Sequence, residues 1–362
     1  MKKAIIAVPY LSGKGGTETV IKNFYDALGE YSNDSKWSWK LISFGGTKYS
    51  FWMKKWPKKI YNFSDKRIIQ LICYATIMPF LIKTILKKEQ PNIFVATNPI
   101  IWTLAYKIKR KTSPNTKIIA WYHYSFKKKD VKKIYLDNVD EFWAISNGIR
   151  KELISMGVPS KKINLIYNPV SITNIEMIPR SHKQNHFVYI GRIDYDGQKN
   201  VSELIKAFND LKGGWRCDLY GSINLETKKR LLNIASENTK NSISFKGFYS
   251  DIWHRIKEAD VLILTSKYEG FGMVLCEAAA HGISLVSSDC PMGPEEIINS
   301  ENGFLYHSGD IKQLSNILNK IISNKIISKS QKLPTAIEAY NSINKFGYKE
   351  FVKRIQLSLV KD

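Results

Sequence analysis

The sequence predicts an α/β protein made of two doubly wound domains, each with a parallel sheet, that face each other across a cleft. Short apolar runs rich in Ile, Val, Phe and Trp alternate with longer helical patterns along nearly the whole chain, which is typical of parallel sheets with crossover helices. The alternation pauses over residues 167–185, where Asn168-Pro169 and Pro179 interrupt regular structure, and then starts again. With 362 residues, the chain is long enough for two domains that each bury a core.

The first series of strands begins close to the N-terminus. An apolar run follows Lys2 and Lys3, but polar residues 12–19 stand where a signal peptide would have its cleavage site, so we interpret the run as a strand. The most apolar stretch of the chain, 68–86, contains a glutamine, a proline and a lysine that make it a poor transmembrane span, and we expect a core helix there. The strands predicted for this domain are 4–8, 41–44, 93–96, 118–121 and 142–145.

A second series of strands follows the pause, and the chain ends in a long helical pattern over residues 337–359. We expect an N-terminal domain over 1–170 and a C-terminal domain over 171–342, with a helix at about 343–362 packing back on the first domain. In doubly wound domains, ligands bind at the carboxyl ends of the strands, so the site should lie there. The strands predicted for the second domain are 187–190, 217–220, 243–245, 261–265 and 283–287.

The basic residues are concentrated in the first half of the chain. Lys plus Arg number 55 and Asp plus Glu 32, which gives a net charge of +23. Residues 1–180 hold 31 basic and 12 acidic side chains (+19), and residues 181–362 hold 24 and 20 (+4). A one-sided excess of this size indicates that the first domain faces something anionic. The four cysteines are far apart, with no C-x-x-C pair, so we expect neither a disulfide framework nor a zinc site. Free cysteines fit a reducing compartment, so we expect a cytoplasmic protein.

The loop after the first strand is rich in glycine and leads into an amphipathic helix. Gly15 and Gly16 would let the backbone approach a phosphate at the helix N-terminus. Glu18 occupies the third glycine position of a dinucleotide-binding fingerprint, which weakens the interpretation as an NAD-binding loop. The loop also lacks the G-K-S/T ending of a P-loop, which weakens the interpretation as an ATPase loop. A tight structural turn is the alternative to anion binding.

Two glutamates, Glu269 and Glu277, flank the start of a helix in the second domain. The strand over 261–265 ends in a glycine-containing turn that carries Glu269, and the helix begins at about Met273. Free backbone N–H groups at such a start can donate to a phosphate or sugar oxygen, and the two carboxylates can accept from sugar or ribose hydroxyls. The alternative is a pair of solvated glutamates.

Two cations bracket the loop that follows the strand over 187–190. Arg192 and Lys199 can converge on a diphosphate, the first as a planar fork and the second as a point charge, and stabilise a leaving group. Asp194 and Asp196 between them resemble a metal-binding D-x-D pair, with loop turn residues as the alternative interpretation.

His123 follows the strand over 118–121 and has aromatic neighbours on both sides. We interpret it as a functional residue at the sheet edge, where it could orient a hydroxyl or stabilise positive charge through its carbonyl group. A structural histidine is the alternative.

Taken together, these motifs resemble those of the retaining nucleotide-sugar glycosyltransferases of family four, which have the GT-B fold of two Rossmann-like domains. The similarity covers nearly the whole chain and is greatest to the lipopolysaccharide-core galactosyltransferases. It is carried by Gly15-Gly16, by Gly191-Arg192 with Lys199, by E-G-F-G-M-V-L-C-E over 269–277, by His123 with Ser125, by 167–170 and by 287–290. The sequence departs from the family at Gly221, where Ser222 stands in place of a frequent second glycine.

The resemblance implies a metal-independent hexosyltransferase with no cofactor. It would move galactose, glucose or an N-acetylhexosamine from a UDP-sugar to a glycan or lipid-linked acceptor in bacterial surface polysaccharide or glycolipid synthesis. The N-terminal domain would bind the acceptor and the C-terminal domain the donor. The resemblance implies His123, Glu269, Arg192 and Lys199 as catalytic residues. It implies as substrate-binding residues Gly15, Gly16, Arg192, Lys199, Phe248, Glu269, Phe271, Gly272, Met273, Val274 and Glu277.

Two other function classes remain open from the sequence. A nucleic-acid-binding protein would account for the charge, but the paired glutamates argue against it, and we expect no nucleic-acid partner. A non-catalytic sensor of nucleotide sugars would keep the same donor-binding residues.

Aromatic and basic residues interleave in the first domain in a way that suits a lipid headgroup interface. We expect the protein to bind peripherally to the anionic surface of the inner face of the cell membrane. A solvated face, with some aromatic side chains in the core, is the alternative. The residues concerned are Phe51, Trp52, Trp56 and Tyr61 with Lys54, Lys55, Lys58 and Lys59, and a second cluster of Lys127, Lys128, Lys129, Lys132 and Lys133.

Overall fold

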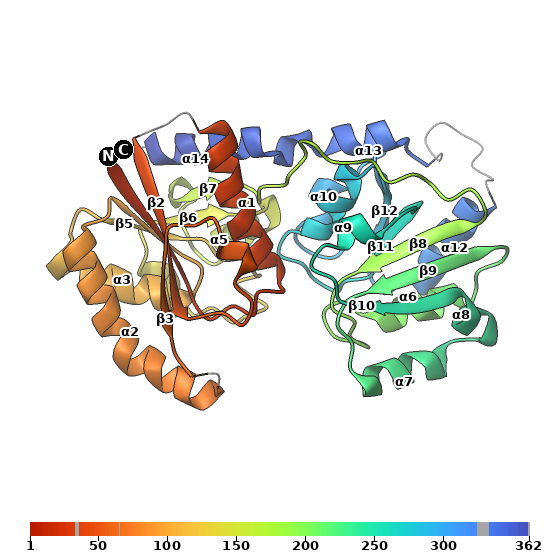
Figure 1. Ribbon diagram of the computed structural model, residues 1–362, viewed down its shortest axis with the longest axis horizontal. Coiled ribbons are helices and arrows are strands. Elements are labelled where there is room, and N and C mark those ends of the chain that lie inside the picture. The colour runs from red at the N-terminus through yellow and green to blue at the C-terminus, as the bar shows by residue number, and fades with distance from the viewer. Residues whose placement is uncertain (33–35, 65, 324–332, 361–362) are drawn as a thin grey trace. The chain divides into compact units, whose positions relative to one another are not determined.

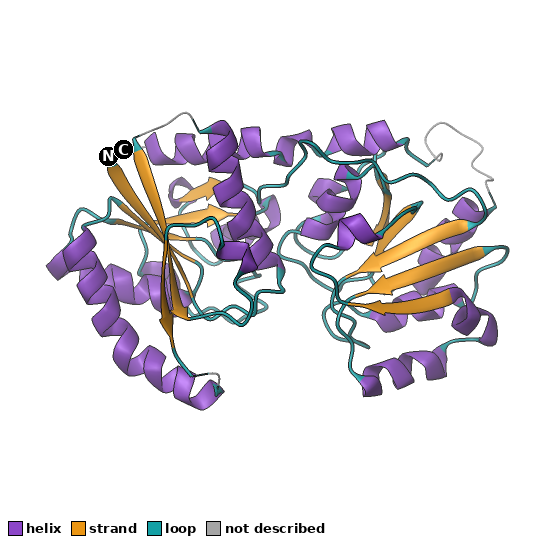
Figure 2. Cartoon of the chain, viewed as in Figure 1, coloured by secondary structure: helices purple, strands orange, loops and turns teal. Residues whose placement is uncertain are grey.

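The computed structural model describes residues 1–32, 36–64, 66–323 and 333–360, and the chain forms two compact units. The first unit contains Met1–Pro169 together with the segment from Tyr348 onward, and the second contains Val170–Gly347. Each unit is a parallel sheet with helices on both of its faces (Figure 1, Figure 2). This confirms the predicted fold class of two doubly wound α/β domains.

The first unit has a seven-stranded sheet in the order β3-β2-β1-β4-β5-β6-β7. All neighbouring strands pair in parallel. The sheet contains two strands at its edges, β3 and β7, that the apolar pattern did not predict. The strands are β1 (Lys2–Val8), β2 (Trp37–Gly45), β3 (Lys58–Asn62), β4 (Ile93–Ala96), β5 (Lys117–Ala120), β6 (Glu141–Ala144) and β7 (Ile163–Leu165).

Aromatic rings form much of the core of the first unit. Phe24 of α1 contacts Trp39 of β2, Trp121 after β5 and Phe351 of α14, with ring centroids 4.9–5.5 Å apart. The last helix therefore packs against the first one in the same unit. The helices of this unit are α1 (Gly16–Tyr31), α2 (Arg67–Glu89), α3 (Pro99–Thr112), α4 (Lys133–Asp137), α5 (Asn147–Ser155) and α14 (Tyr348–Val360).

Two expectations for the first unit are wrong. Helix α2 is not a core helix: of its apolar window, 17% is buried, because the helix lies at the border of the unit and covers α3 with one side only. Trp52 and Trp56, expected at a lipid interface, are buried. The indole of Trp56 donates to the carbonyl oxygen of Ile21, and its ring contacts Phe24, so Trp56 belongs to the core beside α1.

The second unit has a six-stranded parallel sheet in the order β10-β9-β8-β11-β12-β13. Its strands are β8 (Asn185–Ile190), β9 (Trp215–Tyr220), β10 (Ile243–Gly247), β11 (Val261–Leu264), β12 (Ser284–Ser288) and β13 (Gly303–Tyr306). Its helices are α6 (Val201–Phe208), α7 (Leu225–Ile234), α8 (Glu237–Ser242), α9 (Ile252–Arg255), α10 (Met273–Ala280), α11 (Pro294–Ile297), α12 (Ile311–Ile322) and α13 (Ala336–Ser342). The predicted helical pattern over 337–359 is two helices, α13 and α14, separated by a short turn at Asn344–Phe346.

The order of strands reverses direction at one place in each sheet. In the first sheet this place lies between β1 and β4, and in the second it lies between β8 and β11. Loops that leave two such strands run to opposite faces, which leaves a crevice at the carboxyl ends where ligands bind in doubly wound sheets. The fold thus directs attention to the loops that follow β8 and β11.

Candidate functional site

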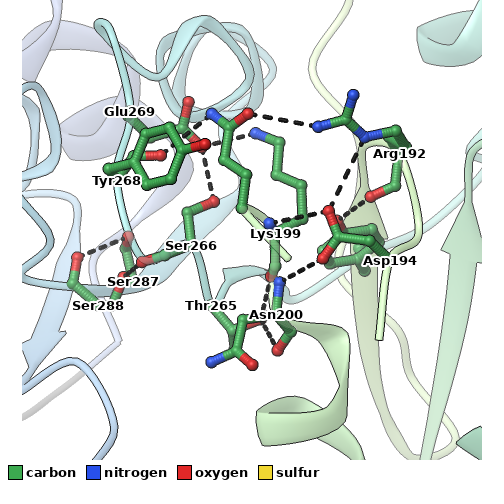
Figure 3. A network of polar contacts seen from close by, with 12 residues as sticks. Arg192, Asp194, Lys199, Asn200, Thr265, Ser266, Tyr268, Glu269, Ser287 and Ser288 are labelled. Atoms are coloured by element: carbon green, nitrogen blue, oxygen red, sulfur yellow. Dashed lines mark hydrogen bonds and ion pairs between the residues drawn. The ribbon is translucent and has the colours of Figure 1, made fainter. Parts of the chain in front are cut away.

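The loops that follow β8 and β11 are joined by hydrogen bonds at the carboxyl edge of the second sheet (Figure 3). The amide of Gln198 donates to the carbonyl oxygen of Tyr268 over 3.1 Å, and the backbone N–H of Lys267 donates to the carbonyl oxygen of Gln198 over 2.8 Å. The hydroxyl of Thr265, at the end of β11, donates to the carbonyl oxygens of Lys199 and Asn200. The two loops therefore hold each other in place.

A buried ion pair lies at the centre of this edge. The ammonium of Lys199 is 2.6 Å from Oε1 of Glu269, and the two side chains are 17% and 8% exposed. The hydroxyl of Ser266 donates to the same carboxylate oxygen over 2.6 Å. Both sequence-predicted residues thus meet although 70 positions separate them in the chain.

Arg192 extends beside this pair and is much more exposed. Its guanidinium is 3.3 Å from the amide oxygen of Gln198 and 3.8 Å from a carboxylate oxygen of Asp194. Asp194 accepts from the backbone N–H groups of Lys199 and Asn200, so its carboxylate closes the loop, as a turn residue does. No group of three or more His, Cys, Asp or Glu side chains suited to a metal ion occurs in the part of the chain that the structure describes.

The loops after β8 and β9 approach each other so closely that a side chain would not fit. A Cβ atom added at Gly221 would lie 1.8 Å from the carbonyl oxygen of Gly191, and Gly221 has a φ of +149°. Position 221 therefore requires glycine. The next residue, Ser222, accepts from the N–H of Ile193 through its carbonyl oxygen, so the departure from the family pattern at 222 is compatible with this contact.

Helix α10 begins immediately after the turn that carries Glu269. Its N-cap, Gly272, has a φ of +92° and leaves the helix start without a side-chain cap. The first N–H groups of a helix have no acceptor inside the helix, so those of Met273 and Val274 can donate to an anion or a hydroxyl. The ring of Phe271 is buried against Phe346, so this residue can present only its backbone.

Glu277 lies one turn into α10, outside the Lys199–Glu269 network. The indole of Trp253 on α9 donates to its carboxylate over 3.2 Å, and Trp253 stacks on His281. Burial raises the pKa of Glu277, and the hydrogen bond from Trp253 opposes that rise. Phe248, just after β10, is 38% exposed.

The glycine loop of the first unit is organised by Glu18. The carboxylate accepts from the N–H of Gly13 over 2.7 Å and from the hydroxyl of Ser12. A Cβ atom at Gly15 would lie 2.7 Å from this carboxylate, whereas one at Gly16 would meet nothing within 4 Å. Gly16 is thus an open position at the start of α1, and the loop is built as a fixed turn.

His123 is buried after β5 with neither ring nitrogen hydrogen-bonded within the protein. Its ring meets the edge of Trp121, with centroids 4.6 Å apart, and burial lowers its pKa to about 3. It is therefore neutral at physiological pH. The following loop is fixed by Glu152, whose carboxylate accepts from the hydroxyl of Ser125 and from the N–H of Phe126.

The structure thus brings together Arg192, Lys199 and Glu269. Helix α10 begins shortly after Glu269 in the chain. The structure places Gly15, Gly16 and His123 at the carboxyl ends of β1 and β5 in the other unit. Sequence reasoning missed Gln198, Ser266, Trp253 and Glu152. Ser266 has a detectable signal, because it directly follows a strand and precedes Glu269 by three positions; Trp253 has none.

Comparison with known proteins gives consistent matches over both units. The model of "Glycosyl transferases group 1" matches residues 171–341, and that of "Glycosyltransferase Family 4" matches residues 42–174. A lipopolysaccharide 1,6-galactosyltransferase of Escherichia coli K12 is 31% identical over 261 residues, which is 70% of this chain and 72% of that protein.

Solved structures resemble the whole chain. The apo form of the lipopolysaccharide outer core galactosyltransferase WaaB superimposes with a TM-score of 0.79 at 27% identity, over 99% of this chain and 100% of that one. Anabaena HepE, solved in complex with UDP, also gives a TM-score of 0.79, at 18% identity and over 99% of each chain. The second similarity concerns the fold alone.

Proposed function

The chain belongs to the group 1 glycosyltransferases of family 4, and from this premise we propose that it transfers a hexose from a UDP-sugar, with retention of anomeric configuration. The acceptor we propose is a glycan or a lipid-linked glycan of a bacterial surface polysaccharide or glycolipid. The galactosyltransferase activity of the E. coli relative supports galactose as the first sugar to test. The UDP bound to HepE, which has the same fold, supports a uridine nucleotide.

The observation that carries the proposal is the buried Lys199–Glu269 pair with Arg192 beside it, at the strand reversal of the second sheet. We assign Lys199 and Arg192 to the donor diphosphate, because two cations at this edge can stabilise the charge that develops on the leaving group. We assign Glu269 to the hydroxyls of the donor sugar, where its carboxylate accepts hydrogen bonds. The backbone from Phe271 through Gly272 and Met273 to Val274 completes this pocket with N–H donors.

Glu277 is assigned to the ribose, since a carboxylate can accept from two vicinal hydroxyls and the indole of Trp253 holds it in place. Phe248 is assigned to substrate binding as an exposed ring of the same unit. In the first unit we assign Gly15 and Gly16 to substrate binding and His123 to catalysis. Since His123 is neutral, it can orient a hydroxyl through a ring nitrogen or offer its carbonyl oxygen to developing positive charge.

In this mechanism the acceptor hydroxyl attacks the anomeric carbon from the face that the diphosphate leaves. The bond from that carbon to the diphosphate oxygen breaks, and the departing phosphate takes the proton of the acceptor. The protein holds the reactants together and stabilises charge. The family is generally metal-independent. We propose the same here, with Arg192, Lys199 and the start of α10 supplying the positive field.

For localisation, we propose a cytoplasmic enzyme that associates peripherally with the inner face of the membrane. The excess of 31 basic over 12 acidic side chains in residues 1–180 supports an anionic surface as its partner.

The proposal is tested by screening UDP-, GDP- and ADP-hexoses for slow hydrolysis and for a rise in melting temperature. We expect UDP-hexoses to give both responses. Arg192→Ala should weaken donor binding or turnover by about 1.5–3 kcal/mol, which is the loss of charge-assisted hydrogen bonds. Arg255→Ala is the matched control, since its side chain is 56% exposed against 62% for Arg192 and its partner is a neighbouring aspartate. Equal kinetics in the two variants would remove Arg192 from the donor site.

A further inference from the structure

Helix α2 presents an apolar surface to solvent that no other described part of the chain covers. Ile68 is 74% exposed and Phe80 is 69% exposed. Within the described residues, α2 is the one helix long and apolar enough to cross a membrane, and 17% of its window is buried. In Figure 1 it lies at the surface of the first unit, next to α3. Its other exposed large apolar side chains are Ile69, Leu71, Ile72 and Ile77.

The opposite side of α2 is fastened to the first unit. The hydroxyl of Tyr74 accepts from the N–H of Tyr10 over 2.8 Å and donates to the carbonyl oxygen of Phe44 over 3.1 Å. Met78 and Ile82 are buried, and the helix packs along α3. A helix held in this way cannot cross a bilayer without losing these contacts. Its exposed side can therefore contact a membrane only while α2 stays packed on the surface of the first unit.

Lysines continue the exposed side where the apolar residues end. Phe80 and Thr84 line a shallow hollow on α2 together with Lys83, Lys87 and Lys88. Over its full length, Arg67–Glu89, α2 carries four basic side chains and one acidic side chain, a net charge of +3. An apolar surface that ends in lysines is complementary to a lipid leaflet, because the apolar groups enter the acyl region while the ammonium groups remain at the phosphates.

We propose that α2 is a membrane-docking helix that lies in the plane of an anionic leaflet. The exposed apolar side chains between Ile68 and Phe80 insert below the headgroups, and Lys83, Lys87 and Lys88 bind lipid phosphates. This proposal rests on the proposed function in one respect, namely that a lipid-linked acceptor requires the enzyme at a membrane. It replaces the surface expected from sequence, whose Trp52 and Trp56 lie in the core.

A second copy of the chain is a weaker candidate for covering this surface. Pairing two copies through α2 would bring together two helices of the same sign, each with a net charge of +3. Like charges at close range oppose association, whereas an anionic leaflet attracts each lysine.

Vesicle binding tests the proposal on the full-length protein without any sugar substrate. The probe is vesicles of phosphatidylglycerol and phosphatidylethanolamine, compared with phosphatidylcholine alone, at low and high salt. The double variant Ile68→Asp with Phe80→Asp should bind anionic vesicles at least about tenfold more weakly. The matched control is Leu225→Asp with Ile337→Asp, on helices of the second unit, where the exposed fractions are 70% and 67% and the charge change is the same. The control should bind as the wild type does.

The lysines are tested separately. Changing Lys83, Lys87 and Lys88 to Gln should weaken binding to anionic vesicles by about a hundredfold at low salt, since each lysine near such a surface contributes about a fivefold factor. Binding to neutral vesicles should not change. Equal binding of this variant and the wild type to anionic vesicles would contradict the assigned role of the lysines.

Cys73 allows the position of α2 to be followed directly. It lies on α2, and the other three cysteines are buried, so an environment-sensitive thiol dye can be directed to it. We expect its emission to shift to the blue on anionic vesicles, whereas a dye on Leu225→Cys in a Cys73→Ser background should not respond. An unchanged spectrum at Cys73 while the protein binds vesicles would show that another surface docks.

These results separate the docking proposal from the proposed function. A wild type that hydrolyses UDP-hexose but does not bind anionic vesicles refutes docking and leaves the enzyme. A wild type that binds vesicles through α2 but acts on no nucleotide sugar refutes the enzyme and leaves docking. If the α2 variants instead convert a dimer into a monomer in sedimentation equilibrium, the surface is an interface between copies and the proposal is wrong.

Discussion

Removing the ammonium of Lys199 should destabilise the second unit as well as impair donor binding. In Lys199→Met, the carboxylate of Glu269, 8% exposed, loses its ion-pair partner and keeps the hydroxyl of Ser266. Breaking a buried ion pair from one side costs about 3–5 kcal/mol. We expect about 3 kcal/mol, at the lower end, because Ser266 still donates to the carboxylate and Lys199 is itself 17% exposed.

The double variant Lys199→Met with Glu269→Gln separates stability from function. Its neutral amide can still accept from Ser266 and leaves no buried charge, so the free energy of unfolding should return to within about 1 kcal/mol of the wild-type value. Affinity for UDP-hexose should stay low, because the charges of Lys199 and Glu269 are both gone and Arg192 alone remains at the diphosphate. The surface pair Lys240–Glu237, 38% and 82% exposed, is the control: Lys240→Met should cost less than about 0.5 kcal/mol.

The measurement must report on the second unit, because seven of the nine tryptophans lie in the first. Hydrogen exchange of peptides from β8 and β11 over a urea series gives the free energy of unfolding there. A double variant no more stable than Lys199→Met would refute the assignment of the loss to an unpaired carboxylate. Wild-type donor affinity in the double variant would remove both residues from the donor site.

Two further predictions concern charge and metal. Burial raises the pKa of Glu277, so its carboxylate destabilises the folded unit once the pH exceeds the ordinary carboxyl value of 4.5. In calorimetry, Glu277→Gln should therefore melt at a higher temperature than the wild type at pH 7 and lose this advantage below pH 4.5. In a titration with donor, the same variant should bind more weakly. Activity should survive a chelator, and its abolition by EDTA with recovery on added manganese would return attention to Asp194 and Asp196.

The strands that the sequence did not reveal share one physical property. β3, β7 and β13 each lie at an edge of a sheet. An edge strand has one neighbour and is often only half covered, so it needs no continuous apolar run. β3 reads Lys-Lys-Ile-Tyr-Asn, and its lysines led to its interpretation as a surface cluster. The inner strands, which are more completely buried than β3, were predicted from their apolar runs because burial itself produces that pattern.

At the site, the sequence could predict the residues whose position follows from their local sequence. Arg192, Lys199 and Glu269 stand in loops directly after strands, so their position follows from local sequence. Trp253 reaches Glu277 from a separate short helix, and no local pattern records that contact. For α2, apolar composition predicted burial correctly only for the side that packs on α3, since composition does not distinguish a protein core from a lipid phase.

The buried pair also bears on how a donor could bind without first breaking it. An ammonium has three N–H donors, and Glu269 takes up one of those of Lys199, so two remain for diphosphate oxygens. Holding Lys199 in one rotamer before the donor arrives removes an entropy cost from binding. Arg192 is the opposite case, since its exposed guanidinium has only longer contacts, to Gln198 at 3.3 Å and to Asp194 at 3.8 Å. On the proposed assignment, the donor therefore meets a lysine already held in place, whereas Arg192 has only these longer contacts to give up.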